Sequence, residues 1–403
     1  MARQSNTRSA QGSGSIRQRS NGRWEARYTV GHNPSTGTQI RRSIYGSSEK
    51  EVLKKLQQVQ VDIEVGAYTE PQKMTVGEWL EIWLKDYTMN IKPSTLSSYA
   101  HNVNSHIIPA LGSIPLQKLN PHTVQGFYNT LLKSGRIKQK CHKKEMPDGL
   151  SARSVNFIHT VLHMALRQAI KLSYMRVNPT EACILPRVPK REMTILQGEQ
   201  IPKFIDAASN HSHKALFLTL LFTGIRIGEA LGLTWDCVDS SNGIIHIRKQ
   251  LQRERVKGGQ LQLVSLKNDK ERKLSPPTTL FHVLAEHKQK QDERQYLLED
   301  LWVQSELVFT NDIGGALDNQ GVYNAFKRML SYNDLPSIRL HDLRHTAATL
   351  MLQNGDDYKT LQDALGHHSA GFTLDTYGHV TDKMKKDSAD RMEAFIQSLP
   401  VSV

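Results

Sequence analysis

The stretch from 340 to 380 constrains this chain more than any other, because it combines a helical pattern with several polar and titratable side chains. His341 and Arg344 are three residues apart, so on a helix their side chains would share a face. His367 follows, and Tyr377 comes ten residues later. A guanidinium, two imidazoles and a phenol suit a hydrophobic core poorly and a phosphate well. This stretch therefore predicts a helix that forms one side of a phosphate-binding site.

A second arginine lies upstream in apolar surroundings. Arg226 is the only basic residue of the run 216–233, whose composition predicts a single helix. A guanidinium is always charged and its planar fork fits phosphate, so an arginine among Leu and Ile needs an anionic partner. Glu229 is one candidate. For this helix alone, a simple buried ion pair explains the pattern as well as a functional site does.

The order of these residues in the chain resembles a known family. Arg226, the H-x-x-R pair, the L-G-H segment and Tyr377 follow one another over about 150 residues. This set resembles the tyrosine recombinases, the integrases that cut and rejoin DNA. Their pattern is an arginine in a T-G-x-R-x-x-E-like helix, a hairpin lysine, H-x-x-R, L-G-H and a nucleophilic tyrosine. A lone H-x-x-R would be weak evidence, but five ordered pieces are specific. The resemblance covers roughly residues 190–385.

Two lysines compete for the hairpin position. The surrounding alternation predicts two strands joined by a turn at 256–260 and a third strand after Lys270. The resemblance favours Lys267, which closes the second strand and is followed by Arg272 at the expected interval. Lys270 remains an alternative, because Asn268 stands where many relatives have threonine. In the family this lysine protonates the departing 5′-oxygen.

The resemblance implies a role for each remaining residue. Transesterification of a phosphodiester builds negative charge on the non-bridging oxygens, which Arg226 and Arg344 would neutralise. His367 would donate a further hydrogen bond to one of these oxygens. Tyr377 would attack phosphorus, with His341 as base or proton relay, since a phenol has a pKa of about 10 in water.

The resemblance also implies which neighbouring histidines are structural and that the reaction needs no cofactor. His345 and His368 adjoin His341 and His367, and we expect both to be structural because the family pattern uses the first of each pair. His368 replaces a serine that is common in relatives. No metal and no cofactor are expected, since Arg and Lys supply the charge that magnesium provides in nucleases.

Composition points to a polyanionic partner. The chain has 52 Lys and Arg against 39 Asp and Glu, a formal charge of +13, and a calculated pI of about 9.5. Its three cysteines, Cys141, Cys183 and Cys237, are far apart, which predicts plain thiols in a reducing compartment. No signal-peptide pattern or membrane-length apolar run occurs in the sequence. We expect a soluble cytoplasmic protein, associated with the nucleoid and not with a membrane.

The first 45 residues hold eight arginines and a single acid, Glu25. We expect residues 1–13 to be disordered and the next segment to form three strands, with apolar side chains on one face and arginines on the other. A helix beginning at the Ser48-x-x-Glu51 capping box would cover the apolar face. Arginines turned outward suit a DNA groove, although solvated charge is the alternative. The segment resembles the arm-binding domain of some integrases, which predicts an arm-type DNA-binding domain over 1–70. The predicted DNA contacts are Arg17, Arg19, Arg23, Arg27 and Arg41.

Residues 72–185 predict a unit of four helices, which the resemblance assigns as the core-binding domain that clamps one side of the duplex. A capping box opens the first helix at Thr75, and later helices start at Ser94, Asn120 and Ser151. Between 133 and 144 lie six Lys or Arg and no acid, which indicates either DNA contact or a solvated loop. A basic linker, 186–193, follows. The predicted contacts are Lys138, Lys140, Lys143 and Lys144 in the loop, and Arg187 and Lys190 in the linker.

The predicted fold class is therefore multidomain α+β. It combines a small three-stranded sheet plus helix, a helical core-binding domain, and a mainly helical catalytic domain with a small antiparallel sheet over 194–403. An amphipathic helix at the end of that domain would either fold back on its own domain or, as the resemblance favours, dock on a neighbouring subunit.

The implied function is site-specific recombination that integrates or excises a mobile element. The implied route runs through covalent 3′-phosphotyrosine links and a Holliday junction. The implied partners are double-stranded DNA at attachment and target sites, a homo-tetramer on that DNA, an excisionase and a host DNA-bending protein. A topoisomerase of type IB and a non-catalytic DNA-binding protein are the alternatives.

Overall fold

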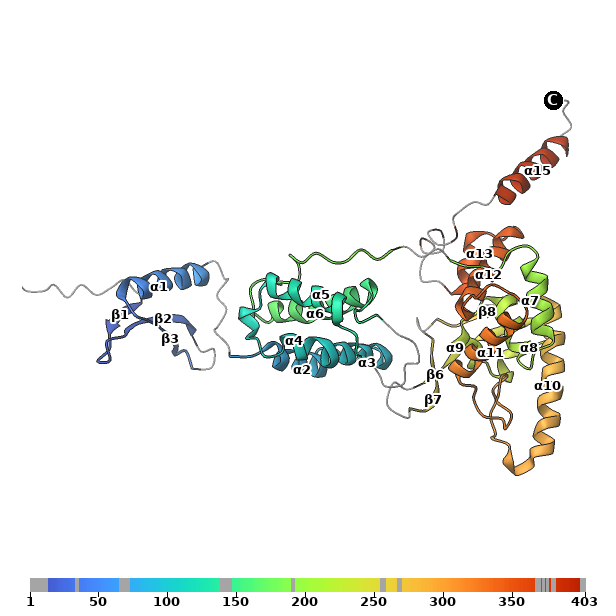
Figure 1. The fold of residues 1–403 in the computed structure, drawn as a ribbon, viewed down its shortest axis with the longest axis horizontal. Helices are drawn as coiled ribbons and strands as arrows, with labels where there is room; N and C mark the ends of the chain where they lie inside the picture. The colour runs from blue at the N-terminus through green and yellow to red at the C-terminus, as the bar shows by residue number, and fades with distance from the viewer. Residues whose placement is uncertain are drawn as a thin grey trace, which may run out of the picture. The chain divides into compact units, whose positions relative to one another are not determined.

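The computed structural model describes residues 14–32, 36–64, 73–137, 147–189, 193–253, 259–266, 270–366, 371, 374, 377 and 382–398. The chain divides into two compact units, Met1–Pro189 and Lys190–Val403 (Figure 1). It is a mixed α/β fold with an N-terminal three-stranded sheet, many helices and small antiparallel sheets, which confirms the predicted class. The predicted domain boundaries stay predictions, and the predicted disordered tail lies outside the described residues.

The first unit begins with a small antiparallel sheet in the order β1-β2-β3. The strands are β1 (Ser15–Gln18), β2 (Trp24–His32) and β3 (Gln39–Gly46), followed by helix α1 (Glu49–Glu64). Ala26 and Tyr28 of β2 are buried against Val52 and Leu56 of α1. The alternation in β2 therefore turns its apolar face to α1, as predicted, and leaves Arg27 on the opposite face.

Helices form the remainder of the first unit. They are α2 (Val76–Asp86), α3 (Pro93–Asn102), the π-helical turn η1 (Val103–Ile107), α4 (Ile108–Leu111), the 3₁₀ turn η2 (Leu116–Lys118), α5 (Pro121–Ser134) and α6 (Ala152–Lys171). The predicted caps of α2, α5 and α6 are present at Thr75, Asn120 and Ser151. Helix α3 begins one residue earlier than predicted, because Pro93 itself occupies the first turn. Trp79 is fully buried, and its Nε1 donates to the carbonyl of Ala165, 3.0 Å away.

The second unit is mainly helical (Figure 1). Its helices are α7 (Gln200–Ser209), α8 (Lys214–Thr223), α9 (Ile227–Leu231), α10 (Thr278–Leu298), α11 (Asn319–Tyr332), α12 (Leu340–Gln353), α13 (Tyr358–Leu365) and α15 (Asp382–Ser398), with 3₁₀ turns η3 (Trp235–Cys237) and η4 (Glu299–Leu301). The strands are β4 (Val238–Asp239), β5 (Ile244–Ile247), β6 (Lys249–Arg253), β7 (Leu261–Ser265) and β8 (Arg272–Leu274). Every side chain of α8 from Ala215 to Leu221 is buried, and this helix packs against α7, α9, α10 and α12. A helix that is apolar all round is expected at the centre of a core.

One local prediction for this unit is wrong. The apolar run 216–233 is two helices instead of one, because Gly224 adopts a left-handed conformation with φ of 63° and ends α8. The third predicted strand is present as β8 and pairs with β5 in the sheet β4-β5-β8, whereas β6 and β7 form a separate hairpin. The turn between β6 and β7 lies partly outside the described residues.

Two features of the helices bear on the sequence predictions. The predicted terminal helix is present as α15, whose Met392 and Phe395 are exposed. Its docking on another subunit stays a prediction. Within the described ranges, no helix combines the length and the apolar character that a membrane crossing requires.

Candidate active site

The break between α8 and α9 positions the first arginine of the site. After Gly224 the chain runs extended through Arg226, which is the N-cap residue of α9. The side chain of Glu229 accepts a hydrogen bond from the backbone N–H of Arg226 at 3.1 Å and another from its Nη1 at 2.7 Å. This reciprocal pair fixes the start of α9 and the direction of the guanidinium together. The arginine side chain remains 27% exposed, so a ligand can reach it.

A second arginine shares the same carboxylate. Glu229 is buried, and its Oε2 accepts from Nη2 of Arg272 at 2.5 Å. Burial alone would raise the pKa of Glu229, but the hydrogen bond and charge of Arg272, with the charge of Arg226, outweigh burial and lower the pKa. The carboxylate is therefore ionised and holds two guanidiniums in place.

The C-terminal end of α13 closes the arginine cluster. Three consecutive carbonyls there each accept a hydrogen bond from a different arginine. The pairs are Arg272 Nε with Ala364 at 2.9 Å, Arg344 Nη2 with Leu365 at 2.7 Å, and Arg226 Nη2 with Gly366 at 3.3 Å. Unpaired carbonyls and the negative end of the helix dipole favour cations at this position.

These three guanidiniums face a single carboxylate, which leaves the cluster short of negative charge. Arg344 of α12 is buried, and its Nη1 also donates to the carbonyl of Gly224 at 2.9 Å. Burial, with repulsion from Arg226, lowers the pKa of Arg344 to about 9. An incoming anion would relieve this repulsion. The cluster of Arg226, Arg272 and Arg344 therefore has the electrostatics of a phosphate-binding site.

Tyr377 lies beside α12, and its hydroxyl is 2.6 Å from Nδ1 of His345. The side chain is 7% exposed and belongs to a small apolar cluster with residues of α12 and α13. Burial raises the pKa of Tyr377 to about 12, although the charge of Arg344 opposes this shift. The phenol is thus protonated at neutral pH and has a hydrogen-bonded imidazole next to it.

His341 lies one helical turn before His345, and their rings are perpendicular with centroids 5.0 Å apart. Desolvation and the charges of its neighbours, His345 first and then Arg344 and Arg226, lower the pKa of His341 to about 4. The side chain nevertheless keeps an exposed surface, and solvent moderates this shift. At neutral pH the ring is uncharged and able to accept a proton.

Comparisons with known proteins agree with this geometry. Residues 194–384 match the Phage integrase family, and residues 75–132 match the Phage integrase, N-terminal SAM-like domain. The chain belongs to the phage integrase family of tyrosine recombinases. Two curated relatives cover nearly its full length. A "Tyrosine recombinase XerC-like" protein of Caldanaerobacter subterraneus subsp. tengcongensis is 25% identical, over 90% of this chain and 94% of the relative. The "ICEBs1 integrase" of Bacillus subtilis is also 25% identical, over 94% of this chain and 99% of the relative.

Solved structures share the fold of this tyrosine recombinase. The Tn1549 transposon integrase bound to transposon right end DNA matches with a TM-score of 0.65 and 21% identity, over 79% of this chain and 100% of that one. A lambda integrase tetramer bound to a Holliday junction matches with a TM-score of 0.54 and 19% identity, over 91% and 96%.

The structure of the recombinase brings together four of the six predicted catalytic residues: Arg226, His341, Arg344 and Tyr377. The other two, Lys267 and His367, lie outside the described residues, as does His368. The alternative Lys270 is described and exposed. In the described part of the chain, no group of three or more His, Cys, Asp or Glu side chains is arranged to hold a metal ion.

Two residues of this site were not selected from the sequence. Arg272 was noted only for its spacing, and His345 was expected to be structural. The spacing of His345 contained a signal, since a residue four positions after His341 on a helix shares its face. Nothing in the sequence indicated that Arg272 would contact Glu229, because that contact depends on the pairing of β8 with β5.

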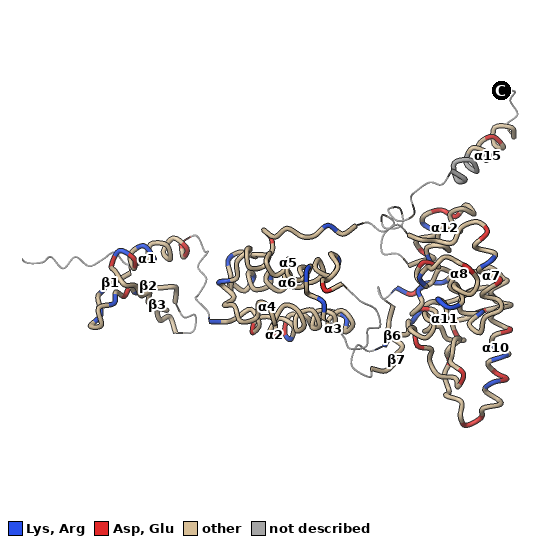
Figure 2. Tube along the Cα trace, viewed as in Figure 1, with Lys and Arg blue, Asp and Glu red and all other residues tan. Residues whose placement is uncertain are grey.

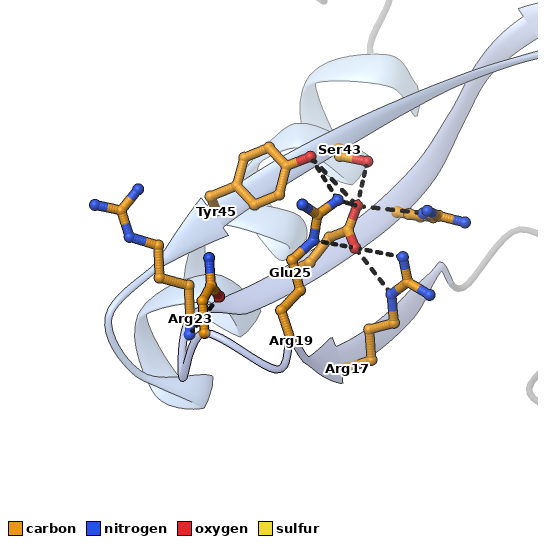
Figure 3. A network of polar contacts seen from close by, with 8 residues as sticks. Arg17, Arg19, Arg23, Glu25, Ser43 and Tyr45 are labelled. Carbon is orange, nitrogen blue, oxygen red and sulfur yellow. Dashed lines mark hydrogen bonds and ion pairs between the residues drawn. The ribbon is translucent and has the colours of Figure 1, made fainter.

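The recombinase has a second arginine cluster on the outer face of its N-terminal sheet (Figure 3). Glu25 of β2 is 1% exposed and accepts hydrogen bonds from Arg17, Arg19 and Arg27, with the closest nitrogens at 2.8, 3.0 and 3.3 Å. Ser43 and Tyr45 of β3 also donate to this carboxylate. Hydrogen bonds from Arg19 outweigh desolvation and, with the other donors, lower the pKa of Glu25 far below its usual range. Three of the predicted DNA-contacting arginines therefore form one array around an ionised carboxylate.

The remaining predicted DNA contacts are spread along the chain between Arg23 and Lys190. Figure 2 shows basic residues along β1 and the adjoining turn, and in Figure 3 the side chain of Arg23 points away from Glu25. Arg41 donates to Gln39 at 2.8 Å, and Arg187 is exposed. The predicted contacts outside the described residues are Lys138, Lys140, Lys143, Lys144 and Lys190.

Proposed function

We propose that this recombinase integrates and excises a mobile element by cutting and rejoining DNA through a covalent 3′-phosphotyrosine link. One observation carries the proposal. A buried, protonated Tyr377 lies beside Arg344, which belongs to a cluster of three guanidiniums that share one carboxylate. A phenol needs a base, and the phosphate it attacks needs cations around its non-bridging oxygens. Both requirements are met within this small region.

The chemical roles follow from the geometry and the resemblance together. Arg226 and Arg344 bind the non-bridging oxygens of the scissile phosphate, and Tyr377 attacks phosphorus. His341 serves as base or proton relay. Lys267 protonates the departing 5′-oxygen and His367 donates to a non-bridging oxygen, roles that rest on the family pattern alone.

Arg272 holds the cluster in place without touching the phosphate in this proposal. Its Nε donates to the carbonyl of Ala364 and its Nη2 to Glu229. It therefore fixes the positions of Glu229 and α13, and through them the direction of Arg226.

We propose that four copies act together on DNA and pass through a Holliday junction. The similar fold of the lambda integrase tetramer on such a junction supports this assembly. Exposed Met392 and Phe395 give α15 an apolar surface for docking on a neighbouring subunit. The arginine array around Glu25 suits arm-type DNA sites, and an excisionase and a host DNA-bending protein are proposed accessory factors. Since its substrate is chromosomal DNA, the proposed location is the nucleoid in the cytoplasm.

Covalent trapping tests this proposal. Wild-type protein and Tyr377→Phe are incubated with DNA spanning the element ends, with chelator present and ATP absent, and then denatured. We expect an adduct with the wild type and none with Tyr377→Phe. Tyr332→Phe, which removes an exposed hydroxyl from α11, is the matched control and should form the adduct normally. Tight binding without any adduct, even on nicked substrates that trap the intermediate, would contradict catalysis. Plasmid relaxation without recombinants would indicate a topoisomerase instead.

A further inference from the structure

His345 contacts the proposed nucleophile directly, although the family pattern does not use this histidine. Its Nδ1 is 2.6 Å from the hydroxyl oxygen of Tyr377, and the ring centroids are 5.7 Å apart. This is the short distance expected for a strong hydrogen bond. If the imidazole proton is on Nε2, Nδ1 is the acceptor and the phenol is the donor.

The surroundings of His345 keep its ring neutral. Burial lowers its pKa, the carboxylate of Asp342 opposes this shift, and the charges of Arg344 and Arg339 reinforce it. Asp342 is itself bound by Arg339 at 2.7 Å, which weakens its pull on the imidazole. From the other side, the ring faces His341 and Tyr377. A neutral imidazole next to a phenol is the state that accepts a proton.

We propose that His345 is a catalytic residue that holds the Tyr377 hydroxyl and accepts its proton when Tyr377 attacks DNA. This inference rests on the proposed function. During cleavage the O–H proton moves to Nδ1, a bond forms between the Tyr377 oxygen and phosphorus, and the bond from phosphorus to the 5′-oxygen breaks. The departing 5′-oxygen takes a proton from the general acid. During rejoining the 5′-hydroxyl returns that proton as it attacks, and His345 gives its own proton back to Tyr377.

His341 fits the next position in this proton path. Its ring is perpendicular to that of His345 at a centroid distance of 5.0 Å, and it has an exposed surface. A proton that reaches His345 can therefore pass toward solvent through His341 or a bridging water. The rings of His341, His345 and Tyr377 thus form two consecutive contacts, with His345 in the middle.

Two other roles for this hydrogen bond predict different effects of removing His345 on the rate of cleavage. If His345 only held Tyr377 in a resting position, its removal would free the nucleophile and speed up cleavage. If His345 were the acid for the leaving group, its removal would slow cleavage in a way that a better leaving group restores.

The experiment measures the rate of adduct formation as a function of pH on two nicked substrates. One carries the natural phosphodiester, and the other has a 5′-bridging sulfur, whose thiolate leaves without protonation. His345→Ala removes the acceptor. His345→Asn places an amide oxygen near the position of Nδ1, so it keeps a hydrogen-bond acceptor that does not titrate. His282→Asn, on the exposed side of α10, is the matched control.

We expect His345→Ala to slow adduct formation about 100-fold at neutral pH, with unchanged DNA affinity and no rescue by the sulfur substrate. His345→Asn should also be slow at neutral pH and should recover as pH rises, because hydroxide then removes the phenol proton. This variant decides the question if His345→Ala fails to fold. A rate within threefold of wild type across the pH range, faster cleavage, or rescue by sulfur would overturn the proposal. Failure of the wild type to form any adduct would refute the proposed function instead.

Discussion

Two buried carboxylates, Glu25 and Glu229, orient arginines in the two units of this recombinase. Each accepts hydrogen bonds from at least two guanidiniums and is outnumbered by them in charge. Positive side chains that would otherwise move freely and repel one another are thus held in fixed positions, which lowers the entropy lost when an anion binds. The single acid among the first 45 residues is therefore part of the arginine array instead of an exception to it.

Substitution of Glu25 by Gln tests this interpretation in the first unit. The variant gains one positive charge, so its affinity for random DNA should rise at low salt. Its arginines lose their common partner, so the ratio of affinities for element-end DNA and random DNA should fall severalfold. Fluorescence anisotropy on both DNAs at two salt concentrations measures this ratio. Glu49→Gln makes the same charge change at an exposed position of α1 and should leave the ratio unchanged. An unaltered ratio in Glu25→Gln would show that the carboxylate does not organise DNA binding.

Two glycines with the same backbone conformation allow the cost of backbone strain to be distinguished from the cost of steric contact by an added side chain. Gly224 and Gly243 have φ values of 63° and 65°, which cost an L-residue about 1–2 kcal/mol. An added Cβ at Gly224 would lie 2.8 Å from Cδ2 of Leu365 and 3.2 Å from Cβ of Ala347, whereas at Gly243 it would meet open space. We expect Gly243→Ala to lower the free energy of unfolding by about 1 kcal/mol, and Gly224→Ala by about 3 kcal/mol with loss of the adduct. Urea unfolding measures the free energy of unfolding of both variants. Equal losses in the two variants would show that the contacts of the added Cβ at Gly224 cost nothing.

At the scale of elements, the sequence predicted what depends on local pattern. The capping residues Thr75, Asn120 and Ser151 begin helices as expected, and the alternation in β2 has the predicted faces. The break at Gly224 was missed because the run 216–233 is apolar on both sides of it. A single glycine does not reveal its backbone angle without the packing that requires it.

The parts of the site that could not be predicted from the sequence depend on contacts between segments that are far apart in the chain. The pairing of β8 with β5 joins residues about 27 positions apart and determines where Arg272 lies. The hydrogen bond between His345 and Tyr377 spans 32 positions. The family pattern led to the choice of His341 over His345. Such a pattern records which residues recur in relatives, but it does not show which side chains are in contact. Arg226 was identifiable because a guanidinium is unusual in an apolar run, and Arg344 and Tyr377 because they complete the ordered family pattern.

The contact between β8 and α9 can be measured by a double-mutant cycle on Arg272 and Glu229. Arg272→Met leaves the buried carboxylate with Arg226 as its remaining cation and should cost about 3 kcal/mol of stability. Combined with Glu229→Gln, it should show a coupling energy of about 2 kcal/mol, because both changes remove the same interaction. The exposed pair Arg294 and Asp312, whose closest atoms are 2.8 Å apart, is the control and should couple by less than about 0.5 kcal/mol. Similar coupling energies in the two cycles would mean that burial of Glu229 does not strengthen its interaction with Arg272.

At the scale of the whole molecule, positive side chains outnumber the carboxylates that could pair with them. The chain carries a formal charge of +13, while the buried carboxylates of both arginine clusters are already paired. Binding of DNA would neutralise this excess, so affinity should fall steeply with salt. The same excess makes further protonation of the free protein unfavourable, which connects charge to acid stability.

Among the histidines that the structure describes, seven have pKa values lowered chiefly by burial: His106, His159, His211, His213, His287, His341 and His345. The unfolded chain binds their protons at a pKa of about 6.5, whereas the native state stays neutral to lower pH. Between about pH 6.5 and the native pKa values the unfolded state therefore holds more protons, and stability must fall as pH falls. Carboxylates contribute little above about pH 5, because they are ionised in both states.

We expect the free energy of unfolding in urea to fall by about 1–2 kcal/mol between pH 7.5 and pH 5.5, after allowance for solvent screening of partly exposed rings. His287→Gln should reduce this pH dependence, because the ring of His287 is held at 2.8 Å from the carbonyl of Val308 in a half-buried position. His122→Gln, at an exposed position of α5, should leave it unchanged. Circular dichroism at several pH values gives the urea midpoints. A midpoint that stays constant or rises toward pH 5.5 would mean that these histidines are protonated in the native state at that pH.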